Sequence, residues 1–207
     1  MNLRRGWAWV GALASLAWVL LAVHVLAEGP TPEWPHETPS GAPSWRLPPL
    51  TRAMVVLDQI IVPIAGASLL ALFAFHAATR QWRATRALLV LAVGGTFLSQ
   101  ALKVLVARSR PPGVALVEVS GYSFPSAQVL LVTLVAGWAT LAACANAQSM
   151  STRLLVGASA AAAMLVVGFS RVYLGAHYPS DVAASILIGI SCLCVCISGR
   201  RPFHEDR

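Results

Sequence analysis

The sequence GFSRVYLGAHYPSD, residues 168–181, lies between two long apolar runs near the end of the chain. It brings Arg171, His177 and Asp181 together in a short polar segment. The flanking runs are too apolar for helices of a soluble protein and are typical of helices that cross a bilayer. Ionisable groups beside a membrane are costly and mark functional sites. We therefore expect a functional site where this segment meets the membrane surface.

The composition indicates an integral membrane protein. Of the 207 residues, 57% are hydrophobic and 11% are charged, whereas a soluble domain has about 25% charged residues. The net charge is +7, but the basic residues lie at the ends of apolar runs and form no stripe with aromatics, which argues against nucleic-acid binding. The four cysteines lie inside apolar runs without His or acidic neighbours, so we expect neither a metal site nor disulfides.

The apolar runs predict an all-α fold, a single membrane domain of six helices over residues 1–207. The predicted spans are residues 7–27, 54–78, 87–107, 127–147, 154–169 and 182–197. The first run exceeds the usual apolar length of a signal peptide, about 7 to 15 residues, so a retained helix is favoured over a cleaved signal. Residues 28–50 contain seven prolines and predict an extramembrane loop.

The distribution of Lys and Arg predicts the orientation. A cytoplasmic N-terminus places most basic residues inside, in agreement with the positive-inside rule. These are Arg4, Arg5, Arg80, Arg83, Arg86, Arg153, Arg200, Arg201 and Arg207. We therefore expect a bacterial cytoplasmic membrane protein with both termini inside and the 168–181 segment on the external or periplasmic face.

The side predicted to be external also carries basic residues that depart from this rule and suggest an anion site, namely Lys103, Arg108, Arg110 and Arg171. An Arg guanidinium binds phosphate through two parallel hydrogen bonds, and Lys supplies a compact charge. A single such residue is more often one that snorkels to lipid headgroups. If the last helix begins between His177 and Asp181, the carboxylate can orient the imidazole as a nucleophile, although Asp181 can also be a helix N-cap.

Three segments together resemble a known family. They are KVLVARSRP (103–111), FPSAQ (124–128) and SRVYLGAHYPSD (170–181). Type 2 phosphatidic acid phosphatases, or lipid phosphate phosphatases, are marked by K-x6-R-P, P-S-G-H and S-R-x5-H-x3-D. From the second helix onward, the chain is similar to this family. The family is similar in fold to the vanadium haloperoxidases. The first and third motifs match at every specified position.

The resemblance implies a reaction and its residues. His177 would attack phosphorus to form a phosphohistidine, and Asp181 would orient it. The reaction would need no metal or other cofactor, and the substrate would be a lipid phosphate or diphosphate in the bilayer. A cage of positive charge suits phosphoryl transfer. The resemblance implies that the phosphate is bound by Lys103, Arg110, Ser126 and Arg171.

The second motif departs from the family at its catalytic position. Gln128 replaces the His that protonates the leaving group, and Ala127 replaces Gly. A glutamine amide cannot release a proton near neutral pH, and general acid catalysis contributes about 10²- to 10⁴-fold. Three interpretations follow: a substrate such as a polyprenyl diphosphate, whose leaving group is already a stable anion; another acid; or a lipid-phosphate binder without activity. The candidates for another acid are Tyr122, Glu118 and His36.

Gln128 also bears on the second half-reaction, because the same family His is expected to help activate water. A long-lived phosphohistidine would favour transfer of the phosphoryl group to another lipid, which makes the protein a phosphotransferase. Elsewhere, Asp58 is interpreted as a polar group at a helix end rather than a partner of a cage Arg. Arg108 adds charge that the family motif does not require, and His24 and His76 are interpreted as structural.

Overall fold

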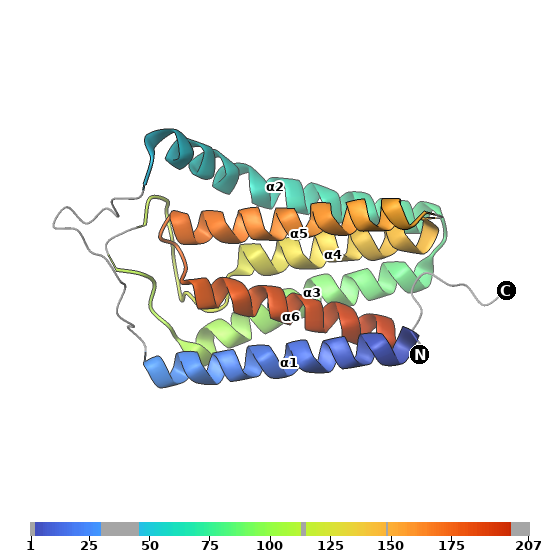
Figure 1. The fold of residues 1–207 in the computed structure, drawn as a ribbon, viewed down its shortest axis with the longest axis horizontal. Coiled ribbons are helices and arrows are strands. Elements are labelled where there is room, and N and C mark those ends of the chain that lie inside the picture. Colours follow the sequence, from blue (N-terminus) through green and yellow to red (C-terminus); the bar gives the residue numbers. More distant parts are fainter. Residues whose placement is uncertain (1–2, 30–45, 113–114, 148, 200–207) are drawn as a thin grey trace.

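The computed structural model describes residues 3–29, 46–112, 115–147 and 149–199 and contains a bundle of long helices (Figure 1). The described residues form six helices and no strand, and all six helices are long and apolar enough to cross a membrane. The helices are α1 (Leu3–Glu28), α2 (Pro48–Ala78), α3 (Trp82–Val106), α4 (Ala127–Asn146), α5 (Met150–Tyr173) and α6 (Pro179–Gly199). The expected all-α membrane fold is thus observed.

Two helices extend into segments that were expected to be irregular. α2 begins at Pro48, inside the predicted loop 28–50, because proline is tolerated in a first helical turn where the N–H has no partner. Residues 30–45 of that loop lie outside the described part of the chain. α5 continues to Tyr173, so Arg171 lies on a helix and not in a loop. The polar 168–181 segment therefore consists of two helix ends joined by a short turn.

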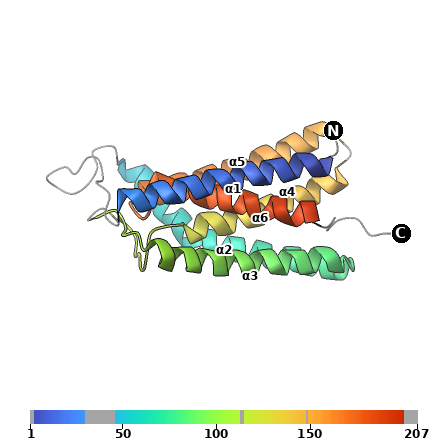
Figure 2. The ribbon, with the colours of Figure 1, turned by 90° about the horizontal axis from the view of Figure 1, so that it is seen from below.

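The helices pack around α4, which contacts α2, α3, α5 and α6. α1 packs most extensively on α6, so the first and last helices lie side by side (Figures 1 and 2). His76 is buried, and its Nε2 accepts a hydrogen bond of 3.0 Å from the indole Nε1 of Trp138, in agreement with a structural role. The main core cluster consists of Ala84, Leu88, Leu91, Leu102, Leu130, Leu134, Trp138, Ile188 and Leu193.

The segments that carry the motifs gather at one end of the bundle. The start of α1 and the end of α6 lie at the other end, together with the α2–α3 and α4–α5 links (Figure 1). Large apolar side chains such as Leu70, Val90 and Phe97 point outward along the helices. Lipid is the solvent that suits such faces. The fold therefore presents polar residues at one end of an integral membrane protein.

Candidate active site

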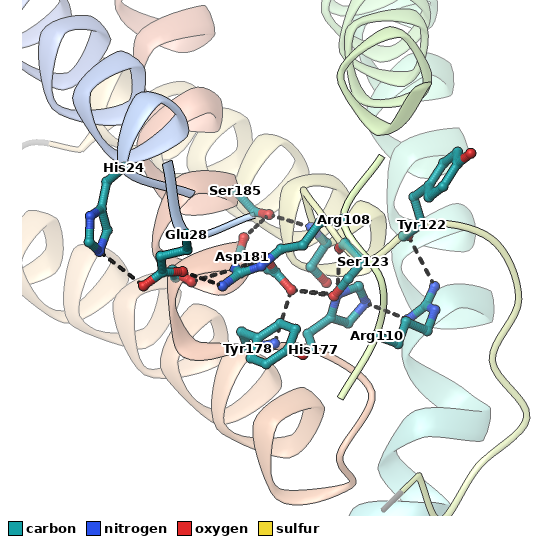
Figure 3. A network of polar contacts seen from close by, with 12 residues as sticks. His24, Glu28, Arg108, Arg110, Tyr122, Ser123, His177, Tyr178, Asp181 and Ser185 are labelled. Carbon is teal, nitrogen blue, oxygen red and sulfur yellow. Dashed lines mark hydrogen bonds and ion pairs between the residues drawn. The ribbon is translucent and has the colours of Figure 1, made fainter. Parts of the chain in front are cut away.

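His177 lies in the turn between α5 and α6, where Gly175 adopts a φ of +71° that glycine accommodates without strain. The imidazole is buried, with 4% of the residue exposed. Its Nδ1 donates to the carbonyl oxygen of Ser123 at 2.8 Å, and its Nε2 lies 3.4 Å from Nη1 of Arg110 (Figure 3). Nε2 therefore carries the lone pair and faces the guanidinium of Arg110, a cation that can bind an anion.

Burial decides the protonation state of His177. Desolvation lowers the pKa of the imidazole from 6.5 to about 4, against the opposing effect of Asp181. The imidazole therefore stays neutral as the pH falls through 6.5 and is protonated only near pH 4.

We expect an NMR titration of histidine-labelled protein in detergent to show this directly. The His177 signal, assigned by its absence in His177→Asn, should stay unprotonated from pH 8 down to pH 5. The reason is that burial destabilises the charged imidazolium, through lost hydration, by more than the attraction of the Asp181 carboxylate stabilises it. A midpoint near 6.5 would contradict the buried position of the ring.

Asp181 supports His177 from the first turn of α6, which begins at Pro179, between the two residues as expected. Its Oδ2 lies 3.6 Å from Nδ1 of His177, longer than a hydrogen bond. The same oxygen accepts from Oγ of Ser123 and, at 2.9 Å, from the backbone N–H of Tyr178. Asp181 therefore reaches the imidazole mainly through Ser123, whose carbonyl and hydroxyl both face the ring (Figure 3).

Arg108 pairs with Asp181 and is not one of the cations that remain to bind a phosphate. It is 2% exposed, and its Nη1 donates to Oδ1 of Asp181 at 2.8 Å and to Oγ of Ser180 at 2.7 Å. Its Nη2 donates to Oε2 of Glu28 at 2.8 Å, and its guanidinium lies 4.1 Å from the ring centre of Tyr178 (Figure 3). The guanidinium thus links the end of α1 to the start of α6.

Two of the predicted phosphate ligands are held by backbone carbonyls. Lys103 on α3 donates to the carbonyl of Tyr122 at 2.6 Å. Arg110 donates to the carbonyls of Gly121 at 3.0 Å, Ala176 at 2.7 Å and Ser120 at 2.8 Å. Burial lowers the pKa of Arg110 from its usual value, and the guanidinium remains a cation at neutral pH. Arg110 therefore lies beside His177 Nε2, and Lys103 is held next to it through the Tyr122 carbonyl that both contact.

The other two predicted ligands have donors without partners. Oγ of Ser126 and Nε of Arg171 are buried and make no hydrogen bond within the described residues. Most buried polar atoms have a hydrogen-bond partner, so an unpaired donor calls for an explanation such as a bound ligand. Nη1 of Arg171 pairs with Oδ1 of Asp58, which also accepts from Nε2 of Gln128 at 3.3 Å. The interpretation of Asp58 as a helix-end polar group is therefore wrong, because the residue pairs with a cage arginine.

The sequence also matches the family model described as the PAP2 superfamily over residues 83–204, a range that contains all three motifs. The chain belongs to the PAP2 superfamily. The fold is similar to that of one solved structure, with a TM-score of 0.71 and 20% sequence identity. The alignment covers 95% of this chain and 98% of the other chain. The solved structure is the crystal structure of the first transmembrane PAP2 type phosphatidylglycerolphosphate phosphatase from Bacillus subtilis. A comparison with curated proteins found no match.

The structure of this PAP2 protein shows where the residues lie that were considered as a replacement for the missing acid at position 128. Tyr122 is 43% exposed, and its hydroxyl points away from His177 (Figure 3). Glu118 is exposed in the loop between α3 and α4, and no contact with the site is recorded for it in the described part of the chain. His36 lies outside the described residues. Neither Tyr122 nor Glu118 occupies the position beside Gln128, where the structure has Asp58.

Sequence reasoning missed Glu28 and Ser123 near the PAP2 motifs, and it considered Asp58 but preferred the wrong interpretation of it. A carboxylate inside an apolar span is a functional candidate by default, and this rule was sufficient to find Asp58. Nothing in the sequence distinguishes Ser123, because its role depends on a carbonyl that faces His177. Within the described residues, no cluster of three His, Cys, Asp or Glu side chains offers a metal site.

Proposed function

We propose that this PAP2 protein is a membrane lipid phosphatase that hydrolyses a polyprenyl diphosphate through a phosphohistidine at His177. One observation carries the proposal: a buried imidazole whose Nδ1 donates to Ser123 and whose Nε2 faces Arg110 at 3.4 Å. The neutral ring is thus oriented as a nucleophile toward an anion bound by the cage. The family and the six apolar helices support a membrane phosphatase as the general class.

The first half-reaction follows from this geometry. Nε2 of His177 forms a bond to the terminal phosphorus, and the bond from phosphorus to the bridging oxygen breaks, releasing lipid monophosphate. The imidazole becomes positively charged, and the Ser123 carbonyl and the Asp181 carboxylate stabilise this charge. The unpartnered donors Ser126 Oγ and Arg171 Nε are placed to bind phosphoryl oxygens.

An apolar cavity supports a lipid as substrate. It has a volume of about 240 Å³, lies between α2, α3 and α4, and is lined by side chains such as Leu88, Leu131 and Leu134. Its lining also includes Ala127 and Gln128 of the second motif. A hydrocarbon chain in this cavity would place its polar end next to the phosphate cage, which matches an amphiphilic substrate.

Gln128 supports a diphosphate over a monophosphate. A departing lipid alkoxide needs a proton, and the glutamine amide cannot supply one. A departing lipid monophosphate is already a stable anion, so its release tolerates the absence of an acid.

The positions of the helix ends support an external site in a bacterial cytoplasmic membrane. The site and the start of α1 lie at opposite ends of the bundle (Figure 1). Arg80, Arg83 and Arg86, around the α2–α3 turn, lie with the start of α1 at the end expected to face the cytoplasm.

The test is an assay of phosphate release by purified protein in detergent. The substrates are polyprenyl diphosphate, polyprenyl monophosphate, phosphatidic acid and phosphatidylglycerophosphate, the last because the similar solved structure is named for it. We expect the wild type to prefer the diphosphate by about 10²-fold or more, the usual contribution of a general acid. Gln128→His should raise the rates on the other three, and Gln59→His, on the exposed face of α2, should not.

Three outcomes would contradict parts of the proposal. Equal wild-type rates on all four substrates would refute the preference for a diphosphate. Activity only in Gln128→His would favour the lipid-phosphate binder. Transfer of the labelled phosphoryl group to added lipid alcohol in place of water would favour the phosphotransferase.

A further inference from the structure

Asp58 of α2 joins two residues of the site that come from other helices. Its Oδ1 pairs with Nη1 of Arg171 on α5 and accepts from Nε2 of Gln128 on α4 at 3.3 Å. The carboxyl side chain is 17% exposed, so it is mostly buried where it meets these two partners. α2 also lies outside the residues matched by the family model.

The atoms around Asp58 have hydrogen-bonding capacity that the described residues do not use. Nε of Arg171 and Oε1 of Gln128 are buried without a hydrogen bond in the described part of the chain. Both hydrogen bonds recorded there for Asp58 use Oδ1, so Oδ2 remains to accept a proton. A water molecule carries two protons, and a pair of acceptors on Gln128 and Asp58 suits it.

The other carboxylates near the site are already engaged. Asp181 accepts from Arg108 through Oδ1 and from Ser123 and the Tyr178 N–H through Oδ2. Glu28 pairs with Arg108 through Oε2 and with His24 through Oε1. Among the described residues in contact with the site, Asp58 is thus the carboxylate with an oxygen available to act as a base.

We propose that Gln128 orients a water molecule and that Asp58 removes its proton as the water attacks the phosphohistidine at His177. This inference rests on the proposed function. The water oxygen forms a bond to phosphorus while the bond from phosphorus to Nε2 breaks and its electron pair returns to the imidazole. The water proton passes to Oδ2 of Asp58 and is released to solvent when inorganic phosphate leaves.

Arg171 explains how the base and the phosphoryl group come together. Its Nη1 holds Asp58, and its Nε is left to donate to a phosphoryl oxygen. One guanidinium can therefore bind both groups at the same time in its planar fork. A glutamine amide orients the attacking water in other phosphoryl-transfer enzymes, which shows that the chemistry is accessible to Gln128.

The test separates the two half-reactions. Wild type and Asp58→Asn are mixed with polyprenyl diphosphate labelled in the terminal phosphate and quenched in alkali, which preserves phosphohistidine. We expect Asp58→Asn to form the phosphoenzyme within a few-fold of the wild-type rate. Its hydrolysis should slow by about 10²- to 10⁴-fold, so the phosphoenzyme accumulates. Formate should restore hydrolysis in Asp58→Ala, because it supplies the missing carboxylate.

Gln128→Ala provides a second arm that leaves the pair between Asp58 and Arg171 in place. Hydrolysis of its phosphoenzyme should slow by about 10-fold, the usual effect of one lost hydrogen bond. Gln59→Ala, on the exposed face of α2, is the matched control and should change neither rate.

The opposite results are distinguishable. If Asp58→Asn slows formation and hydrolysis equally and formate has no effect, Asp58 only positions Arg171 and the inference is overturned. If Gln128→Ala hydrolyses its phosphoenzyme at the wild-type rate, the role of the amide is refuted. If wild type and Asp58→Asn form no phosphoenzyme from any substrate, the proposed function itself fails.

Discussion

Replacement of His177 by Asn is expected to lower phosphate release by at least about 10⁴-fold, the scale on which loss of a nucleophile acts. The asparagine amide can still donate to the Ser123 carbonyl, which now accepts from Nδ1 at 2.8 Å. The variant should therefore fold while it lacks the atom that attacks phosphorus. The measurement is phosphate release from polyprenyl diphosphate, together with alkaline trapping of the phosphoenzyme.

His24→Asn is the matched control for this experiment. His24 is exposed on α1, and its Nε2 pairs with Oε1 of Glu28 at 3.1 Å, at the outer end of the polar network. Its activity should remain within a few-fold of the wild type. Phosphoenzyme in His177→Asn, or turnover above a tenth of the wild-type rate, would assign the nucleophile elsewhere.

Replacement of Arg108 by Leu is expected to cause the largest loss of stability, about 3–5 kcal/mol in the free energy of unfolding. The guanidinium is 2% exposed and pairs with Asp181 and Glu28 at 2.8 Å each. Its removal leaves the fully buried carboxylate of Asp181 without its cation. Chemical unfolding in mixed micelles measures the difference.

Arg52→Leu removes an exposed guanidinium from α2 and should change the stability by less than about 0.5 kcal/mol. An Arg108→Leu variant as stable as Arg52→Leu would show that the buried ion pairs contribute nothing. If Arg108→Leu does not accumulate in the membrane, Arg108→Lys, which keeps a charge but loses the fork, should show an intermediate loss.

Hydropathy predicted the six helices because a bilayer demands long apolar segments, and this demand is visible in composition alone. The helix ends were less predictable. α2 begins at Pro48, because the first turn of a helix tolerates proline. α5 continues past Arg171, because the carboxylate of Asp58 compensates the charge of that residue. The ends of these helices therefore depend on contacts that the apolar pattern does not contain.

The motif spacing predicted that Arg110, Arg171 and His177 belong to one site, and the structure brings them to the same end of the bundle. It did not predict which cations face the ligand. Arg108 and Arg110 are two residues apart, yet one pairs with Asp181 and the other with backbone carbonyls beside His177. That division depends on where α1 and α6 place their carboxylates, a long-range property of the fold.

The link between α1 and α6 also has a consequence for biosynthesis. Glu28 is translated about 150 residues before Ser180 and Asp181, and Arg108 contacts all three. Contacts between distant parts of a chain form late because the chain must first close a long loop. During insertion, α1 therefore enters the bilayer before α6 is available to pair with it. A nascent chain would therefore not complete the proposed site until α6 has been made.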